Sequence, residues 1–346
     1  MTIYEINPQA DPRWSALVEC DPRSSVFHTT EWLGALHKTY KYVPRVFTYT
    51  RPGLQLSSGL AFCEVKSWIT GARLVSLPFS DHCEPLVSDA GELRTILAEL
   101  RKQTAGDLRY IEIRPRSIEI GPQTDFRPYA QHCLSMIDLR PGVEELYSRL
   151  HKDSIQRKLR RAEREHVVLD QGRSEKFLLE FYELMVLTRR RHQIPPQPLA
   201  WFQNLIQSFG KKLTIYVARV DNKAIASILT LRHKKTIVYK YGCSDERFHN
   251  MGAMPFLFWN AIQEAKSEQI EEFDLGRSEA SNEGLIRFKE HLGADRSWLN
   301  YSRSSAPNVV STAGEAAQSS IAHKILSHLP DRLFRLAGEI LYRHIG

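Results

Sequence analysis

The chain has 346 residues, of which 42% are hydrophobic and 25% charged, proportions typical of a soluble globular protein of two domains. No apolar run approaches the roughly 20 residues that a membrane-spanning helix needs, and residues 1–14 lack the order of a signal peptide, so we expect a cytoplasmic protein. The formal net charge of +7 favours an anionic partner such as a nucleotide, RNA or lipid headgroups, although ordinary solubilising charge explains it equally well.

Residues 1–140 are expected to form the first domain, in which short strands alternate with helices. Alternating apolar residues between turn signals predict strands at 43–49, 59–65, 73–77 and 108–113. A helix is predicted at 32–40. A second one, at 92–103, places Leu93, Ile96, Leu97 and Leu100 on one face. The segment 135–139 is expected to cross into the second half.

Residues 141–303 are expected to repeat this order as the second domain. Helices are predicted at 143–165, with an interruption near 153–154, and at 174–192, 199–209, 253–265 and 281–292. Short turns join predicted strands at 213–220, 224–232 and 236–243, which indicates an antiparallel meander. Further strands are expected at 270–275 and 297–302. Residues 304–346 form a third segment, a Ser- and Ala-rich linker followed by an amphipathic helical tail at 321–345.

The turn from Arg247 to Gly252 lies between a predicted strand and a predicted helix. Its spacing allows backbone N–H groups at a helix N-terminus to bind a pyrophosphate, because those amides and the helix dipole attract anions. Such a site suits the phosphates of a carrier such as coenzyme A, or the end of a nucleic acid. A plain strand-to-helix turn is the alternative, but the context favours an acyl-group transferase.

This turn resembles the acyl-carrier loop of GNAT acyltransferases, with Asn250 at the position of the first glycine. Five further motifs follow in the order typical of one branch of that family: Ser76–Asp81, Thr188–His192, Tyr239–Gly242, Phe273–Ser278 and Arg287–Lys289. Together they resemble the Fem-like acyltransferases, the peptidoglycan-bridge aminoacyltransferases and their relatives from exopolysaccharide operons, over residues 25–303. The resemblance implies an α/β fold of tandem GNAT domains with mixed sheets.

The resemblance also implies roles for matching residues. Lys289 would stabilise the negative charge that develops on the donor carbonyl, and Asp81 would hold or deprotonate the acceptor amine. Tyr239 and Tyr241 lie two apart on one strand and are expected on the same face, with Tyr241 as a third catalytic residue. The carrier would contact Arg247, Asn250, Met251, Gly252 and Ala253. The substrate would contact Tyr239, Arg190, His192, Arg277, Ser278 and Phe288.

Each of these residues also has a purely structural interpretation. Lys289 could be a surface lysine, the two tyrosines could belong to the core, and Arg190 and His192 could simply suit the negative end of a helix dipole. Leu36 stands where bridge-forming enzymes carry a lysine, and the long coiled-coil arm of some of them is missing. The donor therefore stays open between acyl-CoA and aminoacyl-tRNA.

No metal site is expected, because the side chains of 81–84 have no second cluster of ligands at metal spacing. The five scattered cysteines favour reduced thiols. The predicted reaction is direct transfer of an acyl or aminoacyl group to an amine or hydroxyl of a sugar or cell-envelope precursor. Two alternatives remain: a non-catalytic assembly factor that binds an anionic polysaccharide or a membrane surface through its tail, and a tRNA-binding protein that uses the basic helix 157–164.

Overall fold

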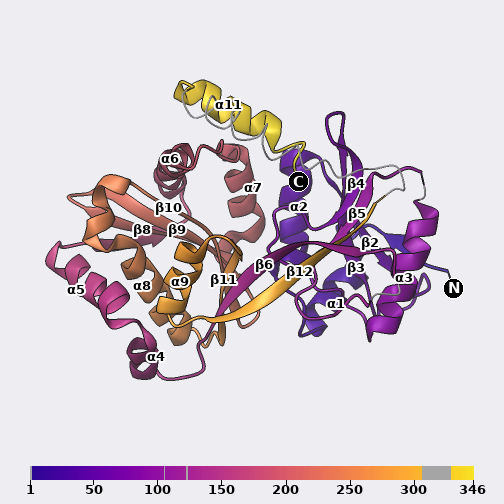
Figure 1. The fold of residues 1–346 in the computed structure, drawn as a ribbon, viewed down its shortest axis with the longest axis horizontal. Helices are drawn as coiled ribbons and strands as arrows, with labels where there is room; N and C mark the ends of the chain where they lie inside the picture. The colour runs from indigo at the N-terminus through magenta and orange to yellow at the C-terminus, as the bar shows by residue number, and fades with distance from the viewer. Residues whose placement is uncertain (1, 105, 122–123, 306–328) are drawn as a thin grey trace. The chain divides into compact units, whose positions relative to one another are not determined.

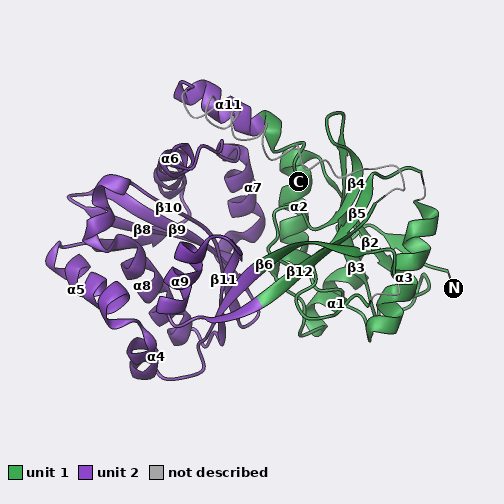
Figure 2. Cartoon of the chain, viewed as in Figure 1, with its two compact units in different colours: residues 1–132, 298–313, 340–346 green, residues 133–297, 314–339 purple. Residues whose placement is uncertain are grey.

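A computed structural model of the chain describes residues 2–104, 106–121, 124–305 and 329–346 (Figure 1). The chain divides into two compact units, coloured separately in Figure 2. Unit 1 comprises residues 1–132, 298–313 and 340–346, and unit 2 comprises residues 133–297 and 314–339. Two long strands, β6 (Arg127–Asp138) and β12 (Asp295–Ser305), contribute residues to both units. The strand β12, the last one among the described residues, thus returns to the first unit.

Unit 1 contains a sheet with the strand order β1-β2-β3-β4-β5-β12. Its strands are β1 (Tyr4–Ile6), β2 (Val43–Thr48), β3 (Leu60–Ser67), β4 (Gly71–Ser76) and β5 (Tyr110–Ile113), in addition to β12. Neighbouring strands pair antiparallel except β4 and β5, which are parallel. The helices are α1 (Pro12–Cys20), α2 (Thr30–Tyr40) and α3 (Ala90–Gln103). The sequence did not predict α1 and β1.

The helix α3 connects the two parallel strands and covers one side of the sheet. It buries the predicted apolar face of Leu93, Ile96, Leu97 and Leu100 in a cluster with strand residues such as Phe62 and Ile111. The helix begins after Asp89, whose carboxylate accepts hydrogen bonds from the amides of Gly91 (2.7 Å) and Glu92 (2.9 Å). A side chain of the protein therefore already occupies the N-terminus of α3.

Unit 2 contains a sheet with the strand order β11-β10-β9-β8-β7. The strands are β7 (Val168–Gly172), β8 (Leu213–Val220), β9 (Lys223–His233), β10 (Thr236–Ser244) and β11 (Glu272–Glu279). The antiparallel meander β8-β9-β10 is confirmed, and β10 pairs with β11 in parallel. The strand β7 was not predicted; it pairs with β8 at the edge of the sheet.

The helices of unit 2 are α4 (Val143–Arg149), α5 (Arg157–Arg164), α6 (Glu175–Arg191), α7 (Leu199–Phe209), α8 (Ala253–Ser267) and α9 (Glu283–His291). A π-helical turn, Lys152–Gln156, precedes α5, so the predicted interruption near 153–154 is confirmed. The predicted tail helix appears as α11 (Asp331–Leu341), while residues 321–328 of that prediction lie outside the described residues. None of the helices in the described ranges has the length and apolar character needed to cross a membrane.

Candidate functional site

A β-bulge in β10 separates the two tyrosines that the sequence placed together. Tyr239 lies opposite Thr230 of β9, whereas Tyr241 lies opposite Leu229, so β10 holds one extra residue, Lys240, at this point. Thr230 and Leu229 are consecutive and therefore point to opposite faces of the sheet. The expectation that both tyrosines share a face is wrong, because the bulge shifts the alternation by one residue.

Tyr239 faces α8. Its ring packs against Phe258 with the ring centroids 4.8 Å apart. Its hydroxyl lies above the α-carbon of Gly242, where a β-carbon would stand only 2.1 Å away. Gly242 is therefore the residue that leaves room for the Tyr239 hydroxyl.

Tyr241 faces α7 instead and belongs to the core of unit 2. Its hydroxyl accepts a hydrogen bond of 2.8 Å from the indole N–H of Trp201, and its ring meets Phe202 edge to face. The side chain is 8% exposed. These contacts are structural, and any role in catalysis stays a prediction.

The parallel ladder between β10 and β11 runs from Thr236–Glu272 to Val238–Asp274, and the bulge follows at once. Beyond β10 the chain enters a 3₁₀ helix, η4 (Glu246–Met251), which is capped by Asp245. The Arg247 guanidinium pairs with this carboxylate at 2.5 Å, and the hydrogen bond from Arg247 is the main reason that the pKa of Asp245 is lowered. Arg247 is thus held against its own loop.

The loop ends at Gly252, whose backbone is left-handed with a φ of +76°. A β-carbon there would lie 2.2 Å from the carbonyl oxygen of Lys158 in α5, so both the conformation and the space require glycine. The helix α8 then begins without a side-chain cap. The amides of Ala253 and Met254, in its first turn, have no acceptor within the helix, and Pro255 contributes no N–H.

A pocket of about 270 Å³ opens at this uncapped helix start. Its walls come from α5, β9, β10, η4, α8 and α9, all within unit 2. The lining residues are Lys158, Ile225, Ala226, Tyr239, Ser244, Asp245, Phe248, His249, Ala253, Met254, Pro255, Leu285 and Phe288. Of the predicted site residues, the structure brings Tyr239, Ala253 and Phe288 together here.

The predicted site residues do not include four polar residues of this pocket: Lys158, Ser244, Asp245 and His249. His249 Nε2 lies 2.9 Å from the Ser244 hydroxyl. Partial desolvation, followed by the positive charge of Arg191, lowers the pKa of His249, so the imidazole is mainly neutral near pH 7. His249 lies within the Arg247–Gly252 loop, so the sequence could have predicted it as a site residue. Lys158 lies in the basic segment 157–164, whose charges are more typical of a solvated helix face.

The remaining loop residues lie outside this pocket. Arg247 lines a neighbouring pocket of about 400 Å³, which shares Ser244 and Asp245 with the first. Asn250 is exposed, and Met251 is half-buried against the apolar core below α8. The loop therefore offers cationic and amide groups on two adjoining surfaces of unit 2.

Lys289 is almost fully buried, at 2% exposure. Its ammonium donates to the carbonyl oxygens of Gly276 (2.8 Å) and Arg277 (3.2 Å), and so fastens α9 to the end of β11. Ser278 follows in the same strand, and its buried hydroxyl has no hydrogen-bond partner within the described ranges. Arg277 itself is half-buried.

Arg190 holds the C-terminal helix. Its guanidinium donates to the carbonyl of Leu329 (2.9 Å) and to the carboxylate of Asp331 (2.6 Å), and it lies 4.6 Å from the ring centroid of Phe334. His192 is exposed at the end of α6, where desolvation and the charges of neighbouring arginines lower its pKa. These two predicted substrate residues thus differ in their surroundings, although they are two positions apart.

Asp81 belongs to unit 1, in the loop between β4 and α3, and is 8% exposed. Arg114 supports this loop by donating to the carbonyls of Leu77 (2.7 Å) and Ser80 (3.2 Å). The nearby Glu84 stabilises the loop that follows β5, because its carboxylate accepts hydrogen bonds from the amides of residues 116–118. In the portion of the chain with described coordinates, no three His, Cys, Asp or Glu side chains converge as metal ligands would.

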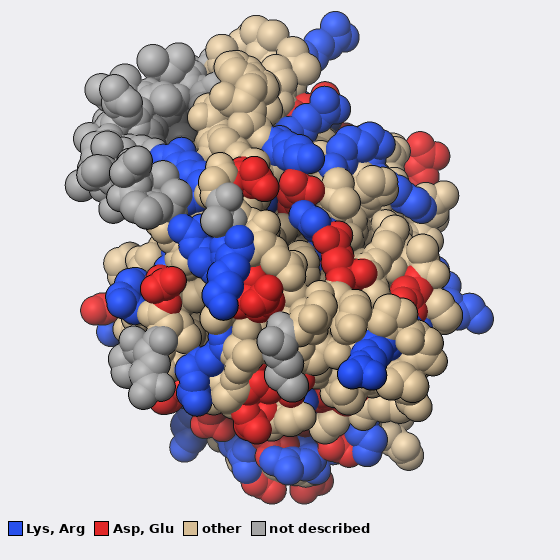
Figure 3. Space-filling view, turned by 90° about the vertical axis from the view of Figure 1, so that its right-hand side faces the viewer, with Lys and Arg blue, Asp and Glu red and all other residues tan. Residues whose placement is uncertain are grey.

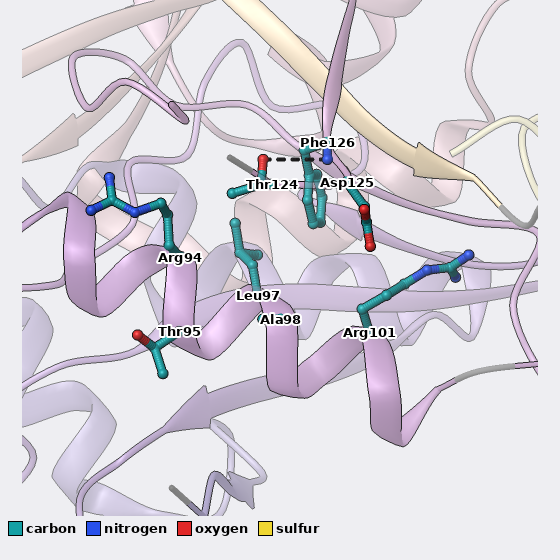
Figure 4. A pocket seen from close by; sticks show the side chains of 8 residues that line it. All are labelled: Arg94, Thr95, Leu97, Ala98, Arg101, Thr124, Asp125 and Phe126. Atoms are coloured by element: carbon teal, nitrogen blue, oxygen red, sulfur yellow. Dashed lines mark hydrogen bonds between the residues drawn. The ribbon is translucent and has the colours of Figure 1, made fainter. Parts of the chain in front are cut away.

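Unit 1 has a pocket of its own, of about 340 Å³, beside α3 (Figure 4). Arg94 and Arg101, which are about two turns apart on α3, project on either side of Leu97, and Asp125 lies near Arg101 in the view. None of the predicted site residues lines it. The parallel β4-α3-β5 arrangement matches β10-α8-β11 in unit 2, but Asp89 caps the start of α3 with a negative charge. Only in unit 2, among these two arrangements, does the helix start stay open to an anion.

Comparison with known proteins agrees with this geometry. Residues 149–290, which form most of unit 2, match the family of acetyltransferase (GNAT) domains. The chain is 27% identical over 144 residues to a UDP-N-acetylmuramoylpentapeptide-lysine N(6)-alanyltransferase from Weissella viridescens, a match that covers 40% of this chain and 42% of that relative. The chain thus matches less than half the length of this relative.

Two solved structures have similar folds over nearly the whole chain. The crystal structure of FemX has a TM-score of 0.69 at 13% identity, and the similarity covers 92% of this chain and 99% of that one. A tandem GNAT protein from the clavulanic acid biosynthesis pathway has a TM-score of 0.54 at 11% identity, covering 89% and 99%.

Residues 149–290 of unit 2 are therefore similar to acetyltransferase (GNAT) domains, and the chain has the mixed α/β fold of a tandem GNAT protein. Within that class, the predicted resemblance to the Fem-like members is confirmed.

Proposed function

We propose that the protein transfers an acyl or aminoacyl group from a carrier to an amine or hydroxyl of a cell-envelope or polysaccharide precursor. The observation that carries this proposal is the uncapped start of α8, which opens onto the pocket of unit 2 within the GNAT segment. The name of the Weissella viridescens relative, a lysine alanyltransferase, supports an amine as acceptor. Because acyl-CoA and aminoacyl-tRNA are made in the cytoplasm, we place the reaction there.

In this proposal the phosphates of the carrier lie against the first amides of α8, with the ammonium of Lys158 beside them. The acyl group extends towards Tyr239 and Phe288. The acceptor nitrogen or oxygen attacks the carbonyl carbon directly, the bond to the carrier breaks, and the proton leaves the acceptor for a base, for which Asp81 stays our candidate. No covalent intermediate with the enzyme forms.

Carrier binding is tested by adding a negative charge at the helix start. Met254→Glu places a carboxylate in the first turn of α8, where it suits the helix dipole but repels phosphate. We expect calorimetry to show at least about tenfold weaker binding of the carrier, equivalent to about 1.4 kcal/mol. The matched control, Gln263→Glu, adds the same charge to the exposed side of α8 and should bind normally.

The titration compares coenzyme A, acetyl-CoA and an aminoacyl-tRNA mimic, and so identifies the donor class. Binding of none of them, or equal binding by both variants, would remove the transferase proposal and favour a non-catalytic assembly factor. Among the coloured residues on the face shown in Figure 3, Lys and Arg are interspersed with Asp and Glu.

Lys289 is proposed to stabilise charge on the donor carbonyl as well as to hold β11. Lys289→Met keeps the length of the side chain but removes the ammonium, so turnover should fall by about tenfold or more while carrier affinity is kept. Calorimetry and initial rates measured on the same preparation separate the two effects. Unchanged turnover would leave Lys289 with its structural role alone.

A further inference from the structure

Unit 1 contains a second pocket, of about 300 Å³, which none of the predicted site residues lines. It is formed by the loop that follows β5, by Pro128 near the start of β6, and by the strand β12. The described residues that line it all belong to unit 1. We call it the β12 pocket.

Trp298 supplies an aromatic ring to the β12 pocket. Its side chain is 46% exposed, whereas Ile118 and Ile120, which also line the pocket, are packed against the core of unit 1. Trp298, Asn300 and Ser302 alternate along β12, and they therefore lie on one face of the strand. The pocket thus presents a flat ring with polar side chains beside it.

An amide pair lies next to the Trp298 ring. The Nε2 of Gln131, in β6, donates a hydrogen bond of 2.9 Å to the Oδ1 of Asn300, and both side chains are exposed. This bond fixes the orientation of the two amides. Within the described ranges, Asn300 Nδ2 remains available as a donor and Gln131 Oε1 as an acceptor. The pair therefore offers a ligand one donor and one acceptor, already oriented.

The loop that borders the pocket is held by a buried carboxylate. Glu84 is 3% exposed and accepts hydrogen bonds from the amides of residues 116–118 (2.5–2.9 Å) and from the Ser117 hydroxyl (2.6 Å). Burial of a charge is costly unless hydrogen bonds satisfy it, and here they connect the charge to a surface loop. The loop is therefore already ordered before a ligand binds, which lowers the entropic cost of binding.

The charges around the pocket balance each other. Among the described residues that line it, the charged ones are Arg116 and Glu119, and both are exposed. One positive and one negative side chain give no excess of charge that would attract a polyanion such as RNA. The pocket therefore suits a neutral ligand that carries hydrogen-bonding groups.

We propose that the β12 pocket binds a carbohydrate, with one sugar ring on the Trp298 indole and its hydroxyls on the Asn300–Gln131 amide pair. A pyranose ring has an apolar C–H face, which packs on a flat aromatic ring. The hydroxyls at its rim both donate and accept hydrogen bonds, as an amide donor and an amide acceptor require. A nucleotide fits less well, because its phosphates would meet no excess positive charge. The proposal requires no acyl carrier and does not depend on transferase activity.

Saturation-transfer NMR of the full chain tests the proposal with maltotriose, cellotriose and chitotriose as probes, and with adenosine 5′-monophosphate for comparison. At least one trisaccharide should bind, and Trp298→Ala should weaken its affinity by about tenfold or more. Trp298→Phe keeps a smaller ring and should lose less. The matched control is Trp68→Ala, which removes another exposed tryptophan of unit 1, in the turn between β3 and β4. It should bind the sugar as the unaltered protein does.

Asn300→Leu tests the amide pair separately from the ring. Leucine has a similar size but neither donates nor accepts, so the affinity should fall by about fivefold, the usual effect of one lost hydrogen bond. Because Trp298 and Asn300 are both exposed, thermal melting of these variants should match that of the unaltered chain.

The proposal is overturned if none of the three trisaccharides binds, or if Trp298→Ala and Trp68→Ala weaken binding equally. It is also overturned if adenosine 5′-monophosphate binds more tightly than the sugars and Trp298→Ala abolishes that binding, because the ring would then hold a nucleobase. Carrier binding by Trp298→Ala should equal that of the unaltered chain. Failure of this proposal can therefore be told apart from failure of the transferase proposal.

Discussion

The Tyr239 hydroxyl lies where a side chain at position 242 would begin, so the two residues depend on each other. This steric relation exists only because the bulge at Lys240 turns Tyr239 towards α8 and the pocket. The same bulge places Tyr241 beside Trp201, in the core. A shift of one residue thus assigns one tyrosine to the pocket and the other to packing.

Gly242→Ala is expected to push the Tyr239 ring into the pocket and so to weaken carrier binding, in addition to an overpacking cost to folding stability of about 1–3 kcal/mol. Calorimetry of a double-mutant cycle checks this. In the Tyr239→Ala background the same alanine should cost much less, because the clashing hydroxyl is gone. Additive effects of the two substitutions would contradict the steric explanation.

At the level of elements, Arg190 connects α6 to α11 rather than reaching the pocket beside α8. It combines an ion pair with a contact to the ring of Phe334. Tyr182 of α6 adds a second contact between the two helices, because its ring centroid lies 5.2 Å from the guanidinium of Arg335. Substrate contact by Arg190 stays a prediction of the family resemblance.

Arg190→Ala should loosen α11 without unfolding unit 2. We expect faster amide hydrogen exchange in residues 331–341, with unchanged exchange in α8 and unchanged carrier affinity. Arg191→Ala, at the next position, serves as the control, since Arg191 lies beside His249 instead. A rise in KM with unaltered exchange in α11 would instead indicate that Arg190 binds substrate.

At the level of the whole molecule, acid stability should depend on a buried histidine of unit 1. His28 Nδ1 accepts from the amide of Ser25 (3.0 Å), so Nε2 carries the proton and donates to the carbonyl of Glu84 (2.8 Å). Burial is the main reason that the pKa of His28 is lowered to about 4. Protonation would place a second N–H against the Ser25 amide, and the folded state therefore resists it.

Because the unfolded chain binds this proton near pH 6.5 and the folded chain only near pH 4, the free energy of unfolding should fall as the pH drops between these values. The loss attributable to His28 is up to about 3 kcal/mol. Urea unfolding from pH 7 to 4 measures it, and His28→Gln should flatten the slope even if it lowers the stability at neutral pH.

The ionisation of Glu112 changes the free energy of unfolding in a separate pH range. Burial opposes its ionisation, but the charges of Arg114 and Arg303 lower its pKa to about 2. Its stabilising contribution is therefore present above pH 4.5 and is lost between pH 4.5 and 2. If His28→Gln leaves the pH dependence of the free energy of unfolding unchanged between pH 6.5 and 4.5, the assignment to His28 is wrong.

Hydrophobic periodicity and turn residues were enough to predict most elements, including the meander β8-β9-β10, the apolar face of α3 and the break before α5. These features depend on residues close in sequence, whose spacing directly reflects helical or strand geometry. Short elements such as β1 and β7 escaped prediction, because they form only by pairing with strands distant in sequence. The order of motifs likewise sufficed for the Fem-like resemblance.

The sequence alone also located the loop that precedes α8, because it lies between a predicted strand and a predicted helix whose first turn contains Pro255. Which side chains surround that loop depended on contacts between distant segments. Lys158 lies beside the loop because α5 packs on Gly252. Tyr239 faces the pocket because the bulge in β10 shifts the alternation of the strand. The guanidinium of Arg190 pairs with Asp331 because α11 packs on α6. Local chemistry thus predicts where an anion can bind, whereas packing across the fold selects the residues that meet it.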